Sequence, residues 1–149
     1  MSRLIAFDHG TRRIGVAVAD SEAGIAFARP ALRERAARDR AAALALIQAE
    51  GAETVVVGLP RNMDGSEGPQ AARARAFGAA LEEVGMIVRY VDERLSSWRA
   101  REHMKEARRQ PSRASGELDS AAARLILQDY LDAGRAPERG GAPQEQESR

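Results

Sequence analysis

Cysteine is absent from this chain of 149 residues, and so are long apolar runs. Without cysteine the protein has no disulfide framework, thiolate metal site or cysteine nucleophile, which suits a reducing compartment. The longest purely apolar run, residues 41–47, is far shorter than the ~18 residues that span a membrane. Asp8 interrupts the N-terminal segment before a signal-peptide core develops. We therefore expect a soluble, cytoplasmic protein with no membrane partner.

Aromatic residues are also scarce, at 4% of the chain. Most of them fall on predicted core positions, so a platform of stacked aromatic side chains for single-stranded RNA is not expected. The sequence contains neither the G-x-x-x-x-G-K-[ST] phosphate loop nor the G-x-G-x-x-G dinucleotide motif. His9 and His103 lack the spacing of paired metal ligands, and we interpret both as structural or incidental.

The charge is nearly balanced, at +1 for the whole chain, but it is unevenly distributed. Residues 89–113 hold eight basic and four acidic side chains, whereas residues 114–149 have a net charge of −3. The basic segment fits either a phosphate-binding patch or a solvated helix face. The loop that follows residue 59 adds another arginine that could meet a phosphate. The candidate substrate contacts are Arg61, Arg94, Arg108, Arg109 and Arg113.

Hydrophobic periodicity and turn residues predict an α/β fold. Strands are expected at residues 3–8, 12–19, 25–28, 54–59 and 86–91. Helices are expected at residues 33–50, 69–84, 96–109 and 118–133, with a loop at 111–116. The order is β-β-β-α-β-α-β-α-α. It predicts one five-stranded mixed sheet, in which a meander precedes right-handed crossovers, with helices on both faces.

The last residues differ in composition from the rest. Residues 134–149 contain no Leu, Ile, Val, Phe, Tyr, Trp or Met. Such a segment cannot bury enough apolar surface to offset the entropy of ordering, so it is predicted to be a disordered tail. The length that remains, residues 1–133, fits a single domain with one core.

Acidic residues stand at the ends of the predicted elements. Asp8 ends the first strand, Asp92 and Glu93 end the last strand, and Asp119 begins the last helix. In open sheets with crossovers, ligands bind beyond the carboxyl ends of the strands, so the strand-end acids are expected at one edge. Spacing alone favours an ordinary turn residue for Asp8 and an ordinary helix N-terminal acid for Asp119. If these acids instead converged, they would repel one another unless divalent cations, Mg²⁺ or Mn²⁺, lay between them. Such ions can activate a water molecule for hydrolysis of a phosphodiester.

Four blocks of the sequence carry a family resemblance. They are residues 8–17 (DHGTRRIGVA), 57–66 (VGLPRNMDGS), 91–96 (VDERLS), and 118–122 (LDSAA) with 125–131 (LILQDYL). In this order they resemble the YqgF family. These are Holliday junction resolvase-like proteins, also described as nucleases for the precursor of the small-subunit (16S) ribosomal RNA.

The resemblance implies a ribonuclease H-like nuclease domain over residues 1–133. It implies a nuclease that uses Mg²⁺ or Mn²⁺, with Asp8, Glu93 and Asp119 as catalytic and metal-binding acids and Asp92 as a further candidate ligand. With the family in view, the ligand interpretation of these acids is favoured. Processing of pre-16S rRNA ends is favoured over resolution of branched DNA, by a monomer or a homodimer.

Two other classes of function stay open at this point. One is a nucleic-acid-binding regulatory module that keeps the fold without catalysis. The other takes Asp8-x-Gly-Thr11 as the phosphate loop of an actin-like or sugar-kinase fold, although that fold closes two related domains around ATP and this chain has the length of one.

Overall fold

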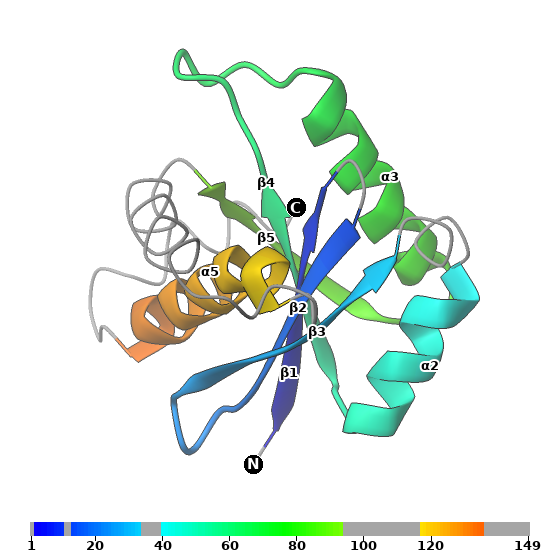
Figure 1. Ribbon diagram of the computed structural model, residues 1–149, viewed down its shortest axis with the longest axis vertical. Coiled ribbons are helices and arrows are strands. Elements are labelled where there is room, and N and C mark those ends of the chain that lie inside the picture. Colours follow the sequence, from blue (N-terminus) through cyan, green and yellow to red (C-terminus); the bar gives the residue numbers. More distant parts are fainter. Residues whose placement is uncertain (1, 11–12, 34–39, 94–116, 136–149) are drawn as a thin grey trace.

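The chain forms eight described elements in a computed structural model (Figure 1). The structure describes residues 2–10, 13–33, 40–93 and 117–135, and the side chains of all of these except 117–119 and 135. The elements are β1 (Arg3–His9), β2 (Arg13–Asp20), β3 (Ala26–Arg33), α2 (Arg40–Glu50), β4 (Thr54–Leu59), α3 (Pro69–Glu83), β5 (Ile87–Asp92) and α5 (Glu117–Arg135).

The strands form one mixed sheet in the order β3-β2-β1-β4-β5. β1, β2 and β3 pair antiparallel through short turns, whereas β4 runs parallel to both β1 and β5. Short turns allow only antiparallel neighbours, and the parallel strands are reached through the crossover helices α2 and α3. The predicted mixed five-stranded sheet is therefore confirmed. The strand order adds that β1 lies at its centre.

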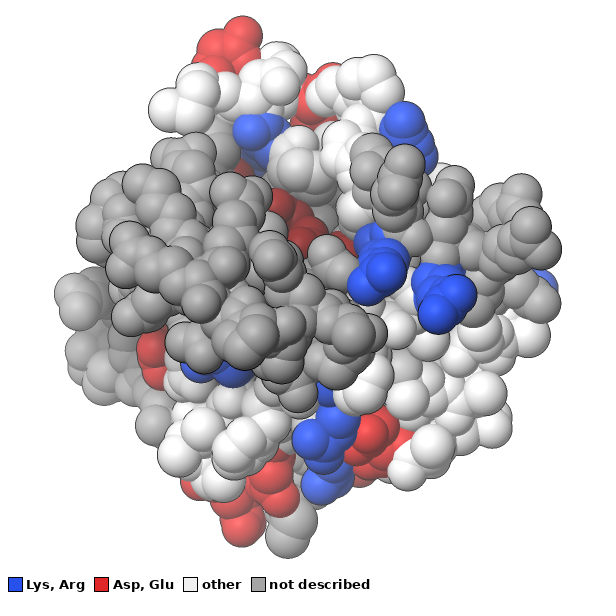
Figure 2. Space-filling model, viewed as in Figure 1, with Lys and Arg blue, Asp and Glu red and all other residues white. Residues whose placement is uncertain are grey.

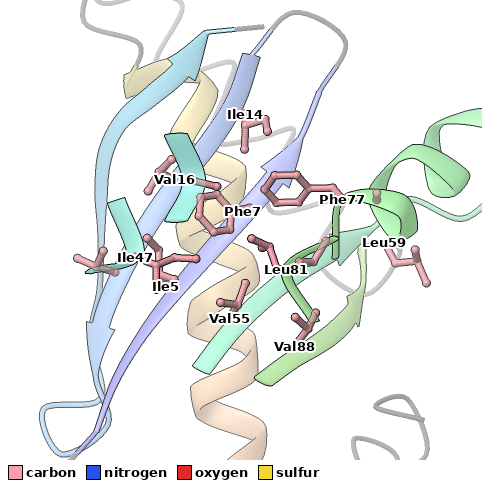
Figure 3. Close-up of a cluster of buried hydrophobic side chains, with 14 of the residues drawn as sticks. Ile5, Phe7, Ile14, Val16, Ile47, Val55, Leu59, Phe77, Leu81 and Val88 are labelled. Atoms are coloured by element: carbon pink, nitrogen blue, oxygen red, sulfur yellow. The ribbon is translucent and has the colours of Figure 1, made fainter. Parts of the chain in front are cut away.

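Helices cover both faces of the sheet, as predicted. α2 and α3 lie on one face and α5 crosses the other (Figure 1). Side chains alternate between the faces along each strand. In β1, Phe7 packs toward α3, where its ring meets Phe77 edge to face at a centroid distance of 5.2 Å, as Figure 3 shows. Ala6 lies in the second core cluster, under α5. Each large side chain buried in this way contributes about 1.5–3 kcal/mol.

Two element boundaries differ from the prediction. β3 continues to Arg33, where the sequence predicted a strand that ends at residue 28 and a helix that begins at 33. The strand passes through Pro30, which β3 tolerates because it is an edge strand. The described part of α2 begins at Arg40, and residues 34–39 lie outside the described residues.

Several predictions fall on parts of the chain that are not described. These are the helix at 96–109, the loop at 111–116 and most of the predicted tail, from residue 136 onward. α5 extends through residues 134 and 135, which the sequence assigned to the tail. Across the described ranges, no helix combines the length and the apolar character that crossing a bilayer requires.

Candidate active site

Two of the predicted acids, Asp8 and Glu93, lie on the same face and at the same edge of the sheet. Asp8 stands two residues after Ala6 on β1, and Glu93 stands two residues after Val91 on β5. Ala6 and Val91 both belong to the core cluster beneath α5. Because side chains alternate along a strand, Asp8 and Glu93 continue that face beyond the apolar cluster.

The two carboxyl groups are in direct contact. The side chains of Asp8 and Glu93 share a hydrogen bond. Burial, the charge of Asp8, this hydrogen bond and the charge of Asp92 together raise the pKa of Glu93 to about 9. Two adjacent carboxyl groups cannot both ionise without a compensating cation, so Glu93 holds the proton and donates it to Asp8.

Gly58 makes room for this contact. It lies on β4, the strand between β1 and β5, and it faces the same side of the sheet as Val56, two residues earlier. A Cβ atom at Gly58 would stand 2.6 Å from Glu93 Oε2 and 2.6 Å from Ile126 Cδ1 of α5. Such distances are too short for van der Waals contact, so only glycine allows the Glu93 carboxyl group to cross β4 toward Asp8.

Asp92 lies on the opposite face of β5. It follows Val88 and Tyr90 in the alternation that places side chains on the α3 side. Its buried carboxylate forms an ion pair with Arg61, whose Nη1 is 3.3 Å from Asp92 Oδ2. The structure therefore separates Asp92 from the hydrogen-bonded pair, although its charge still contributes to the raised pKa of Glu93.

Arg61, a predicted substrate contact, is held by two carboxylates. Besides Asp92, it meets Glu67 with 3.4 Å between Nε and Oε2. Glu67 also pairs with Arg75 at 2.7 Å, and the hydrogen bond from Arg75 lowers the pKa of Glu67. This network closes the loop between β4 and α3 against the end of β5. The other predicted substrate contacts, Arg94, Arg108, Arg109 and Arg113, lie outside the described residues.

The third predicted acid, Asp119, lies in the first turn of α5. Its side chain is not among those described. The next residue, Ser120, is fully buried and links the helix to the sheet. Its hydroxyl group accepts a hydrogen bond from the Val16 backbone N–H at 3.0 Å and donates one to the Arg29 carbonyl oxygen.

A β-bulge explains why Ser120 finds these backbone groups. Val16 pairs with Arg29 and Ile14 with Leu32, so two residues of β3 lie opposite Gly15 alone. The bulge opens the ladder, and the Ser120 hydroxyl group bridges the opening. On its other side, Gly15 pairs with Asp8. Ser120, at the start of α5, is thus bonded to the backbone of Val16. Val16 directly follows Gly15, the cross-strand partner of Asp8.

Sequence reasoning missed two of these residues, Gly58 and Ser120. Gly58 lies inside β4, as predicted, but the sequence analysis gave it no role in the site. A glycine within a β-branched, uncharged strand often marks a close approach of another group. Ser120 is the polar member of a run of small residues on the packing face of α5, and a polar group there requires a partner.

The donor set fits a hard divalent cation. Asp8 and Glu93 offer carboxylate oxygens, which Mg²⁺ and Mn²⁺ prefer. The pair is held together by one proton, which a cation could replace. Among the side chains that the structure describes, no group of three candidate ligands occurs, and the side chain of the third predicted acid is not included in that set.

The fold defines the class of protein. The chain superposes on the solved structure "T. thermophilus RuvC in complex with Holliday junction substrate" with a TM-score of 0.57 and 18% sequence identity. The match covers 91% of this chain and 98% of that chain. The architecture is therefore that of the ribonuclease H-like α/β fold, as the sequence resemblance implied.

The family follows from sequence comparison. The sequence model of the RuvX family, described as "Holliday junction resolvase", matches residues 2–133. A relative from Opitutus terrae is 45% identical over 133 residues, covering 87% of this chain and 91% of the relative. One from Myxococcus xanthus is 40% identical over 148 residues, covering 98% of each. Both bear the name "Putative pre-16S rRNA nuclease". The chain belongs to the RuvX family of nucleases, which confirms the resemblance drawn from its motifs.

Proposed function

We propose that this protein is a divalent-metal-dependent nuclease that processes the ends of pre-16S rRNA. The hydrogen-bonded pair of Asp8 and Glu93 is the observation that carries the proposal. Two partly buried carboxyl groups in contact destabilise the fold once both are charged, unless a cation sits between them. The names of the relatives from Opitutus terrae and Myxococcus xanthus support the choice of substrate.

In this proposal Asp8, Glu93 and Asp119 hold the metal and the reacting phosphate at one edge of the sheet. When bound, Mg²⁺ or Mn²⁺ polarises the phosphodiester and lowers the pKa of a water molecule. Glu93 gives up the proton that it shares with Asp8, so both carboxylates become available as ligands. Gly58 keeps the space that Glu93 occupies, and the first turn of α5 supplies Asp119.

The remaining predicted residues take supporting roles. Asp92 and Arg61 fix the end of β5 through their ion pair, so Asp92 acts on Glu93 by position and charge rather than as a ligand. Arg94, Arg108, Arg109 and Arg113 stay proposed contacts to substrate phosphates.

The test is cleavage of an RNA fragment that spans the 5′ end of mature 16S rRNA and its precursor extension, with Mg²⁺, Mn²⁺ or EDTA. We expect metal-dependent cleavage by the full chain, and a loss of at least about 100-fold in Asp8→Asn, Glu93→Gln and Asp119→Asn. Asp20→Asn is the matched control. Asp20 lies at the end of β2 that is far from Asp8, and an Asn side chain there can still accept the hydrogen bond from the Glu22 N–H. Equal activity in Asp8→Asn and Asp20→Asn would contradict the proposal.

Resolution of four-way DNA junctions is the second candidate. It is favoured by the description of the family model that covers residues 2–133. The discriminating measurement is cleavage of a four-way junction and of the precursor RNA under the same conditions. Symmetrical paired incisions in the junction, with the RNA left intact, would replace the RNA proposal by this one. Metal-independent binding of either substrate without cleavage would instead favour the non-catalytic module.

A further inference from the structure

Two arginines face one another across the outer strands of the sheet. Arg13 at the start of β2 pairs directly with Arg33 at the end of β3, and both side chains are exposed. Like charges directly opposite each other on antiparallel strands destabilise a sheet. The pairing places two exposed guanidinium groups side by side on one face of the sheet, and such a concentration of positive charge points to an anionic ligand.

The pair lies beside the candidate active site. Arg13 stands two residues before Gly15, which pairs with Asp8, so Arg13 and Asp8 share a face of the sheet. Diagonal neighbours of this kind are about 7–8 Å apart, within reach of a long side chain. As the cross-strand partner of Arg13, Arg33 faces the same side. Figure 2 shows acidic side chains in the middle of one face of the molecule with basic side chains to their right.

We propose that Arg13 and Arg33 form a binding site for backbone phosphates of the nucleic-acid substrate, on the β2–β3 side of the acids. This inference rests on the proposed function and names part of its substrate site. Two neighbouring guanidinium groups can each donate paired hydrogen bonds to phosphate oxygens. Phosphates held there would lie next to Asp8, although the acids themselves repel them.

The test separates stability from binding by changing Arg33. Arg33→Glu turns the repulsive pair into an attractive one, and Arg33→Gln removes one charge. Both changes are made in the Asp8→Asn chain, which does not cleave. The probe is a labelled RNA hairpin with a single-stranded extension, titrated at several salt concentrations. Arg3→Gln is the control, because Arg3 is a partly exposed arginine at the end of β1 that is far from Asp8.

We expect Arg33→Glu to raise the melting temperature while it weakens RNA binding by about tenfold at low salt. Arg33→Gln should lower the slope of log affinity against log salt by about one. Arg3→Gln should leave the slope unchanged. Unchanged affinity and slope in both Arg33 variants, together with RNA cleavage by the chain that retains Asp8, would overturn this inference and leave the proposed function standing. A wild-type chain that neither binds nor cleaves would overturn both.

A separate observation, the two hydrogen bonds of Ser120, points to a positioning residue. We infer that Ser120 sets the place of Asp119 by bridging the β-bulge opposite Gly15, and this inference also rests on the proposed function. The same helix has a second link of the same kind. Gln128 accepts a hydrogen bond from the Ala26 N–H and donates one to the Gly24 carbonyl oxygen, each at 3.0 Å. It lies two turns farther along α5, so it provides a matched control.

The experiment compares Ser120→Ala with Gln128→Ala below their melting temperatures. Both variants lose a bridge between α5 and β3, so both should melt earlier. Only Ser120→Ala should bind Mn²⁺ at least about tenfold more weakly, as loss of an outer-shell partner does, and lower kcat with little change in KM. Ser120→Cys, which keeps the size of the side chain and a weak donor, should be intermediate and is measured whether or not the alanine variant folds.

Wild-type Mn²⁺ affinity in the Ser120 variants would overturn this inference if Asp119→Asn weakens Mn²⁺ binding. Unchanged affinity in Asp119→Asn as well would instead remove Asp119 from the proposed metal site. Equal losses of affinity in the Ser120 and Gln128 variants would show a structural effect of α5 alone and would also overturn the inference.

Discussion

Glu93 donates a hydrogen bond to Asp8 across the bare backbone of Gly58. The two acids come from β1 and from the end of β5, and the sheet places β4 between them. A side chain on β4 at this point would separate them. The pair is therefore a product of strand order and of one missing Cβ atom, and it exchanges a proton for a cation in the proposed reaction.

The stability of the metal-free protein should fall as the pH rises. The folded-state pKa of Glu93 is about 9, above its ordinary value of 4.5. The folded state thus binds more protons between these values, and the contribution of Glu93 is fully present below pH 4.5 and lost as the pH approaches 9. Urea denaturation in EDTA between pH 5 and 9 measures this trend. Glu93→Gln should flatten it, and an unchanged slope in that variant would contradict the assignment.

Divalent cations should reverse the loss at alkaline pH. At pH 8, Mn²⁺ in hundredfold excess over its dissociation constant should stabilise the protein by about 2.7 kcal/mol. Binding should also release protons, because the ligands must lose them. Thermal melting and calorimetry in two buffers of different ionisation enthalpy measure both effects. Asp8→Asn should show neither, whereas Asp20→Asn should behave as the wild type.

A methyl group at Gly58 should disturb the acids. Gly58→Ala places a Cβ atom 2.6 Å from both Glu93 Oε2 and Ile126 Cδ1. Crowding of this kind costs about 1–3 kcal/mol, and we expect nuclease activity to fall at least about tenfold because Glu93 must move. Gly68→Ala is the control, since its Cβ atom would meet nothing nearer than 3.9 Å. Denaturation and cleavage assays on both variants measure these effects. Equal stability and equal nuclease activity in Gly58→Ala and Gly68→Ala would contradict the prediction.

Loss of Arg61 should remove the ion pair that this residue forms with the buried carboxylate of Asp92. We expect Arg61→Met to destabilise the protein by about 1–3 kcal/mol, less than a fully buried pair because Arg61 is partly exposed. The double variant with Asp92→Asn should recover part of this loss, and a double-mutant cycle by urea denaturation measures it. The salt dependence of RNA binding should stay unchanged in Arg61→Met. A decrease in that slope would show that Arg61 also contacts phosphate.

Local patterns predicted the elements well where one structural preference dominated. β4 matches its predicted bounds because a β-branched, uncharged run between turn residues has no competing structure. The boundary after β3 was predicted poorly, since Pro30 and the alanine-rich run that follows favour an early strand end and an early helix. An edge position with a bulge overrides both preferences, and an edge position is a property of the whole sheet.

The site could be predicted only in part for the same reason. The sequence places Asp8 and Glu93 at strand ends, but their contact depends on β4 being the strand between β1 and β5, which no local pattern gives. The separation of Asp92 from the pair follows from alternation along β5 and could have been predicted. The bridge at Ser120 depends on a bulge in a different strand pair, so it could not.

The position of α5 also determines when the site can be completed. Ribosomal synthesis proceeds from the N-terminus, and domains generally fold as units once enough chain is available. All five strands are made before α5, which carries Ser120 and Asp119 and covers the cluster around Ala6 and Val56. A nascent chain that ends before this helix lacks the element that packs on this apolar sheet face, and its proposed set of acids is incomplete. Docking of the helix therefore closes the core and completes the proposed catalytic acids in one step.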